Sequence, residues 1–240
     1  MHQLRIMIIG ASSGIGRKLA ELYAAENAMV GITARRKELL EEIKNQYPEH
    51  IEYECFDVMI PGFDHHMESL VKKLGGLDVL IISAGVGEPA KELSWAIDKR
   101  TVDTNINGFL ASANWGFNYF LKQGHGHLVN ISSIAAARGG SHAPAYNASK
   151  AFQSNYFEGL SIKAIRLKTP ITVLSVEPGF VDTKMSKSET IFWLVPLEKA
   201  ARQIKRAIKR KKRKIYVSRR WWIIAKLMKW APFWIYRRFG

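Results

Sequence analysis

The segment at the start of the chain constrains its fold more than any other. Residues 4–9 form a short apolar run rich in β-branched side chains, and Gly10, Gly14 and Gly16 follow in a turn that leads into a helical pattern. Glycines let the backbone approach an anion closely, and a helix N-terminus offers unpaired N–H groups at the positive end of its dipole. Strand, glycine turn and helix in this order predict a site for a dinucleotide diphosphate. The spacing G-x3-G-x-G is not the common G-x-G-x-x-G, so an ordinary strand-to-helix turn is the alternative.

Apolar runs and helical periodicity alternate along the rest of the chain, and no Pro-, Gly- or Ser-rich linker divides it. Helices are expected over residues 102–121 and 146–167, among others. Such alternation builds a parallel sheet through right-handed crossovers. We therefore predict one Rossmann-like, doubly wound α/β domain of about seven strands over residues 1–217, with helices on both faces of the sheet. Strands are expected near residues 4–9, 28–33, 51–56, 77–82, 127–132, 171–176 and 214–217.

The end of the second predicted strand indicates which dinucleotide would bind. Residues 28–33 are followed by Ala34, Arg35 and Arg36. An acidic residue here would bond a free ribose 2′-hydroxyl, whereas Ala34 followed by Arg35 suits a 2′-phosphate. This favours NADP(H) over NAD(H). The alternative is that the two arginines only begin a solvated helix.

A second motif, S-x12-Y-x3-K, is formed by Ser133, Tyr146 and Lys150. Tyr146 and Lys150 lie four residues apart, on one face of a helix, where an ammonium favours the phenolate and lowers the phenol pKa toward the range of a general acid or base. Ser133 ends an apolar run over residues 129–131, so its hydroxyl is expected at a strand tip, where it would hold a carbonyl oxygen. By itself, a Tyr and a Lys at this spacing are usually a surface pair.

Further motifs follow in an order that resembles the short-chain dehydrogenase/reductase superfamily from about residue 4 to about residue 217. Where that family usually has Asn-Ala-Gly, this chain has Ser83-Ala84-Gly85, and because Ser83 keeps a small polar group, altered local hydrogen bonding rather than lost activity is expected. The remaining matches are Asp57-Val58 after the third strand, the N-x-x-G motif from Asn105 to Gly108, and the loop from Pro178-Gly179 to Thr183.

The resemblance implies an oxidoreductase that acts on a carbonyl or hydroxyl substrate. Tyr146 would exchange a proton with the substrate oxygen, and Ser133 would orient that oxygen. Lys150 would lower the tyrosine pKa and bond the nicotinamide ribose, and Asn105 would hold a water that links Lys150 to solvent. A dimer or tetramer is usual in this family.

The glycine turn, Arg35 and the resemblance together imply an NADP(H) site. Asp57 would contact the adenine edge, and Thr183 the carboxamide. No metal is expected, because the seven histidines and the single cysteine, Cys55, show no ligand spacing. The residues of the predicted cofactor site are Gly10, Ser12, Ser13, Gly14, Ile15, Gly16, Arg35, Asp57, Val58, Ala84, Gly85, Tyr146, Lys150, Pro178, Gly179, Val181 and Thr183.

The positive charge of the chain is concentrated near its C-terminus. Residues 199–240 contain 16 Lys and Arg and no acidic residue, whereas residues 1–198 contain the other 20 together with all 21 Asp and Glu. Charges interrupt every apolar run, so this region is not expected to cross a bilayer. Residues 218–240 form a basic, Trp-rich tail, which Pro232 is expected to bend or split. On a helical wheel Lys226, Lys229 and Arg237 share one sector, opposite Trp221, Ile224, Leu227, Met228 and Ile235.

This pattern is typical of an amphipathic helix that lies in a membrane interface, and we predict membrane-surface contact through residues 205–239. The alternatives are packing on the domain or on a partner subunit and, less favoured, nucleic-acid binding. The segment from Lys184 to Val195, which covers the substrate in the resembled family, contains the apolar run 191–195. A hydrophobic, lipid-like or isoprenoid-like ketone or aldehyde is therefore expected.

Two other expectations concern address and function class. The chain begins almost immediately with a strand, which leaves no room for a signal peptide and favours a cytoplasmic address, peripheral on a membrane. A scaffold that senses NADP(H) while its tail binds a partner is the alternative to an enzyme. The complete set of Ser133, Tyr146, Lys150 and Asn105 argues against it, since binding alone does not require an activated phenol.

Overall fold

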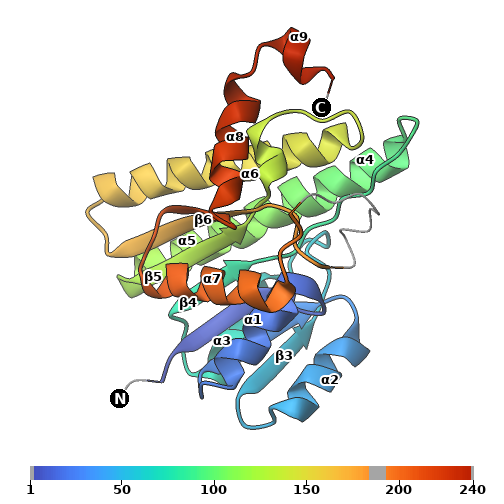
Figure 1. Cartoon of the computed structure of the whole chain (residues 1–240). Helices are drawn as coiled ribbons and strands as arrows, with labels where there is room; N and C mark the ends of the chain where they lie inside the picture. Colours follow the sequence, from blue (N-terminus) through green and yellow to red (C-terminus); the bar gives the residue numbers. More distant parts are fainter. Residues whose placement is uncertain (1–2, 184–192, 239–240) are drawn as a thin grey trace.

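The computed structural model describes residues 3–183 and 193–238, which form one parallel sheet with helices on both faces (Figure 1). The strand order is β3-β2-β1-β4-β5-β6-β7. Every neighbouring pair is parallel, as right-handed crossover connections require. The strands are β1 (Arg5–Ile9), β2 (Met29–Ala34), β3 (Ile51–Cys55), β4 (Val79–Ile82), β5 (Gly126–Ile131), β6 (Ile171–Pro178) and β7 (Lys214–Val217).

Apolar side chains on both faces of the central strands explain why the sheet is doubly covered. Successive residues of a strand point to opposite faces, so Ile6 and Ile8 of β1 pack in one core while Met7 and Ile9 pack in the other. The first core is closed by α1 (Gly14–Ala24), α2 (Lys37–Gln46) and α7 (Leu197–Lys209). The second is closed by α3 (Asp64–Leu74), α5 (Phe109–Gln123) and α6 (Pro144–Arg166).

The predicted doubly wound α/β fold is confirmed, and the seven predicted strands lie within a few residues of the observed ones. The predicted helix over residues 102–121 is more complex. It consists of the end of α4 (Trp95–Val102), a π-helical turn η1 (Asp103–Gly108) and α5. Such turns widen the helix locally and are frequent at functional sites. Asn105 lies inside η1.

Two short helices follow β7 and stand at the C-terminal end of the chain, drawn in red in Figure 1: α8 (Arg220–Trp230) and α9 (Phe233–Tyr236). Pro232 lies between them. Trp221 and Ala225 of α8 are buried against Ile134 of η2 (Ile134–Ala137), a 3-10 turn directly after Ser133. The C-terminal helices therefore pack on the loop that follows β5.

Arg138 fastens these helices to that loop. Its Nη1 donates hydrogen bonds to the carbonyl oxygens of Met228, at 2.9 Å, and of Ala231. Its guanidinium lies 4.2 Å from the ring centroid of Tyr236, whose hydroxyl donates to the Gly139 carbonyl at 2.6 Å. Arg138 thus caps the C-terminus of α8, where carbonyls lack helical partners. None of the helices among the described residues is long and apolar enough to cross a bilayer.

Replacing Arg138→Met should loosen α8 and α9 without unfolding the sheet. A hydrogen bond to a charged group contributes about 1.5–3 kcal/mol, so amide hydrogens of α8 should exchange at least about tenfold faster. Hydrogen–deuterium exchange read by mass spectrometry measures this, with Arg202→Met, which removes only an exposed pair with Glu198, as the control. Equal exchange in α8 for both variants would show that Arg138 does not hold the helix.

Candidate active site

A cavity of about 570 Å³ lies at the carboxyl ends of the central strands. This is the edge where β1 has β2 on one side and β4 on the other, so the connections diverge to opposite faces and leave a crevice. Ser133 and almost all the residues of the predicted cofactor site line it. Gly16 and Asn105 are the predicted site residues that do not.

The glycine turn is held by close backbone contacts. Gly10 has φ +87°, and a Cβ there would lie 2.5 Å from Ala84 Cα, in the loop after β4. A Cβ on Gly16 would lie 2.3 Å from the Gly10 carbonyl oxygen. Gly16 therefore lets α1 pack on the turn and has no direct place in the cavity. No acidic residue occurs in the first turn of α1, so the positive end of that helix faces the cavity unopposed.

The two arginines after β2 occupy different places. Arg36 Nη2 donates to Ser12 Oγ at 2.9 Å and to Ser13 Oγ at 3.3 Å, so it lies against the glycine turn. Arg35 Nη1 instead lies 3.7 Å from Asp57 Oδ2. The sequence assigned the 2′-phosphate to Arg35, which stays a prediction, and did not single out Arg36 as a residue that contacts the turn. Arg36 comes one residue after Arg35 in an extended segment, where successive side chains point to opposite sides of the chain. This alternation was the signal that the two arginines would have different partners.

Tyr146 and Ser133 meet at the other end of the cavity. Ser133 lies at the N-cap of η2, where its Oγ accepts a hydrogen bond from Ala135 N at 3.1 Å. Burial raises the pKa of the Tyr146 phenol, and a hydrogen bond with Ser133 acts in the opposite direction. The sequence predicted a pKa lowered by Lys150. In this chain the Lys150 Nζ lies 5.8 Å from the Tyr146 ring centroid, and burial lowers the pKa of Lys150 itself to about 7.

Lys150 is buried and held by two acceptors. Its Nζ donates to the Ile131 carbonyl at 3.2 Å and to Gln153 Oε1 at 3.0 Å. Gln153 is fully buried, and its Nε2 donates to the Asn105 carbonyl at 2.8 Å. A side-chain amide thus links Lys150 to Asn105. The predicted water, held by Asn105 and linking Lys150 to solvent, stays a prediction. Gln153 was missed, although a polar residue three positions after Lys150 on the same helix face was a signal for it.

The side chain of Asn105 forms hydrogen bonds with the loop after β4 and with α6. Its Nδ2 donates to the Val86 carbonyl at 2.7 Å and to Ser149 Oγ at 3.0 Å, and its Oδ1 accepts from Val86 N at 2.8 Å. These bonds tie η1, α6 and the loop after β4 together. In the same loop, a Cβ on Gly87 would lie 2.5 Å from Tyr146 Cδ2. Gly87, also missed from the sequence, lets the loop pass against the tyrosine ring.

Aromatic side chains surround the loop after β6, on the side of the cavity where Thr183 lies. The Trp221 ring contacts Phe180 and Trp193 edge to face, with centroids 5.4 Å and 6.3 Å apart. A Cβ on Gly179 would lie 2.1 Å from Trp221 Nε1. Trp221 is therefore buried in the domain, and its predicted place on a membrane-facing side is wrong, because packing on η2 and on this loop covers it. Most of the predicted substrate-covering segment, residues 184–192, lies outside the described residues.

The buried ammonium of Lys150 has a consequence for stability against pH. Its pKa is about 7 in the folded chain and 10.5 ordinarily, so between these values the unfolded chain binds a proton that the folded chain has lost. Stability therefore rises with pH across this window, and falls as pH decreases toward 7. In Lys150→Met this contribution should be absent. Urea unfolding of both proteins at pH 7 and pH 9.5 measures it, and a difference between them that does not change with pH would contradict the assignment.

A family model described as short chain dehydrogenase matches residues 5–191. An uncharacterized oxidoreductase of Mycobacterium tuberculosis is 32% identical over an alignment of 242 positions, which covers 95% of this chain and 90% of the relative. An uncharacterized oxidoreductase of Staphylococcus aureus is 33% identical over 184 residues, which cover 75% of this chain and 79% of the relative.

Solved structures share the fold. ElxO, solved with NADP bound, has a TM-score of 0.80 at 22% identity, covering 91% of this chain and 99% of ElxO. A short-chain dehydrogenase from Sphingobium yanoikuyae, solved in complex with NADPH, has a TM-score of 0.79 at 21% identity, covering 93% of this chain and 92% of that one. With a family match over most of its length and relatives named as oxidoreductases, the chain belongs to the short-chain dehydrogenase family.

Proposed function

We propose that the chain is an NADP(H)-dependent oxidoreductase that transfers hydride between the nicotinamide and the carbonyl or hydroxyl carbon of a hydrophobic substrate. The observation that carries this proposal is the convergence of Ser133, Tyr146 and Lys150 on the cavity that also contains the glycine turn. A nucleotide-sensing scaffold would need the turn but not the phenol, the hydroxyl and the buried ammonium beside it.

The residues of the cavity fit the cofactor. The N-terminus of α1 and the backbone of the glycine turn offer donors to a diphosphate. Arg36, held by Ser12 and Ser13, and Arg35 supply two cations beside the end of β2, where a ribose 2′-phosphate would lie. ElxO and the Sphingobium enzyme, which share this fold, were solved with NADP or NADPH. When bound, the cofactor supplies or accepts the hydride.

The chain itself handles the proton. Because burial raises its pKa, the Tyr146 phenol is protonated at neutral pH, which is the form that donates to a carbonyl oxygen during reduction. Ser133 Oγ, hydrogen-bonded to the phenol, orients the same substrate oxygen. Once Tyr146 has given up its proton, the Lys150 ammonium stabilises the phenolate. Gln153 Oε1 and the Ile131 carbonyl hold that ammonium in place despite its burial.

The substrate is expected to be apolar near its reacting carbon. Phe180, Trp193 and Trp221 form an aromatic wall by the loop after β6. Separately, Leu93 and Trp95, which follow the loop after β4, are about four-fifths exposed. A hydrophobic ketone or aldehyde suits such walls. The proposal includes contact with a membrane surface through residues 205–239. The cytoplasmic address and the dimer or tetramer stay predictions.

Replacing Tyr146→Phe should abolish turnover and leave cofactor binding intact. A general acid contributes about 100-fold to 10,000-fold, so NADPH oxidation with a panel of hydrophobic ketones and aldehydes should fall by at least about 100-fold. NADPH binding, followed by its fluorescence, should stay within about twofold of the parent. Turnover that survives in the variant would exclude the proposed role of Tyr146, and turnover in neither protein with NADPH bound to both would favour the scaffold.

Arg36→Ala should weaken NADPH binding at least about tenfold, because a hydrogen-bonded charge lost from the 2′-phosphate removes about 1.5–3 kcal/mol. NADH binding should change less than about twofold, since NADH has no such phosphate. Arg35→Ala is the matched comparison, because Arg35 already pairs with Asp57. If only Arg35→Ala lost NADPH affinity selectively, Arg35 rather than Arg36 would be the residue that binds the 2′-phosphate, as the sequence predicted.

A further inference from the structure

Helix α8 presents three distinct faces. Trp221 and Ala225 pack on η2, as described above. Trp222, Lys226 and Lys229 line a second cavity on another side. The third face consists of exposed apolar side chains at helical spacing, and α9, after a break at the extended residues Ala231 and Pro232, exposes two more aromatic side chains. These residues, here called the apolar stripe, are Ile223, Leu227, Trp230, Phe233 and Trp234, with 54%, 62%, 76%, 72% and 62% of their surface exposed.

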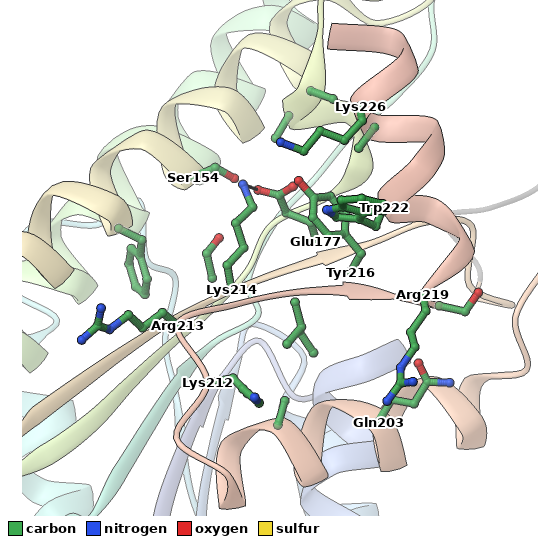
Figure 2. Close-up of a pocket in the computed structure, with 18 of the residues that line it drawn as sticks. Ser154, Glu177, Gln203, Lys212, Arg213, Lys214, Tyr216, Arg219, Trp222 and Lys226 are labelled. Carbon is green, nitrogen blue, oxygen red and sulfur yellow. Dashed lines mark ion pairs between the residues drawn. The ribbon is translucent and has the colours of Figure 1, made fainter. Parts of the chain in front are cut away.

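The second cavity, of about 1710 Å³, surrounds the edge strand β7 between α6, α7 and α8 (Figure 2). Ten Lys and Arg but only two Glu line it, so it is strongly positive. Figure 2 shows Lys214 of β7 and Lys226 of α8 extending toward the same part of the cavity, beside Ser154. We call this the basic cavity.

Most of this charge has no ion-pair partner among the residues that the structure describes. Glu177, which is 2% exposed, lies on the floor of the basic cavity and pairs with Lys214 at 2.5 Å. The other nine basic residues form no ion pair with any residue in the described ranges 3–183 and 193–238. Ser175 is buried on the same floor, and its Oγ forms no hydrogen bond with another described residue. All nine are exposed side chains, so solvent screens their mutual repulsion, and together they make this face positive and attractive to an anionic ligand.

The apolar stripe decides between the polyanions that such a cavity would attract. A nucleic acid would match the charge, but aliphatic Ile223 and Leu227 would gain nothing from its phosphates or bases. A bilayer offers both an acyl boundary for the stripe and phosphate headgroups for the cations next to it. Trp222 and Lys226 lie next to the stripe residue Ile223 on the helical wheel of α8, so the face that lines the basic cavity adjoins the stripe.

We propose that the basic cavity is a binding site for the phosphate headgroup of an anionic phospholipid, occupied when the apolar stripe of α8 and α9 enters the headgroup–acyl boundary. This deepens, and rests on, the membrane contact proposed above. It assigns the stripe to insertion and the cavity to headgroup selection. Trp221 takes part in neither, because it is buried against the loop after β6.

The test uses the full-length protein and sedimentation with vesicles of phosphatidylcholine, alone or with 30% phosphatidic acid, at 150 mM salt. The cavity variant is Arg213→Gln with Lys226→Gln. Its control is Lys72→Gln with Lys122→Gln, which removes the same charge from two exposed residues of α3 and α5, on helices that do not line the cavity. The stripe variant is Leu227→Ser with Trp230→Ser. NADPH binding verifies that every variant is folded, independently of turnover.

The parent should bind the phosphatidic-acid vesicles and not phosphatidylcholine alone. The cavity variant should lose at least about tenfold in affinity, the control less than about threefold, and the stripe variant all measurable binding. If the cavity variant and its control lost the same affinity for the vesicles, the headgroup site would be overturned, and binding would be due to general electrostatic attraction between the protein and the membrane surface. Binding by the parent with no loss in the stripe variant would overturn insertion.

Two further binding experiments test other phosphate-containing ligands, a soluble metabolite and a nucleic acid. Soluble glycerol 3-phosphate should bind the parent at least about tenfold more weakly than the vesicles, because it gains nothing from the stripe. Tighter binding to this soluble phosphate than to vesicles would identify a free metabolite as the ligand and overturn the lipid assignment. A fluorescent single-stranded RNA that binds more tightly than the vesicles, with affinity that falls steeply with salt, would do the same in favour of nucleic acid.

Discussion

Close contact of backbone with backbone or with a ring, at positions where a Cβ would not fit, is the constraint on which the site depends. Gly10 brings the turn after β1 against Ala84 in the loop after β4, and Gly16 seats α1 on that turn. Gly87 lets the second loop pass the Tyr146 ring, and Gly179 accepts Trp221. The connections after β1, β4 and β6 therefore converge on one edge of the sheet. A methyl group at any of these positions would require a neighbour to move.

Lys150 is the buried cation of the site, and several hydrogen bonds of the site depend on its position. Its ammonium is buried, which lowers its pKa to about 7, yet two acceptors remain to hold the charged form. Gln153 is one of them, and it also bonds the backbone of Asn105 in the π-helical turn. The position of Lys150 is consequently tied to η1 and, through the Asn105 side chain, to the loop beside Tyr146. Proton donor, cation and loop form one connected unit.

The C-terminal helices lie between the candidate active site and the positively charged cavity. Trp221 packs beside Phe180 and Trp193, while Arg138 ties the end of α8 to the loop that begins at Ser133. The same helix lines the basic cavity and carries the apolar stripe. A bilayer bound at α8 would therefore lie near the aromatic wall of the proposed substrate region. A hydrophobic substrate and a membrane contact are thus compatible with one placement of the helix.

The sequence by itself determined the order of strands and helices along the chain, the glycine turn and the grouping of Ser133, Tyr146 and Lys150 in one cavity. Those features depend on local periodicity and on residue types at short spacings, which a single chain segment displays. Only the tertiary structure decided that Arg36 contacts the turn, that Gln153 joins Lys150 to Asn105, and that Gly87 faces Tyr146. It also buried Trp221 and left Ile223 and Trp230 exposed on the same helix. A helical wheel places Trp221 opposite Ile223 and Trp230, but it cannot tell which of the two sides is covered, because that depends on elements far away in the chain.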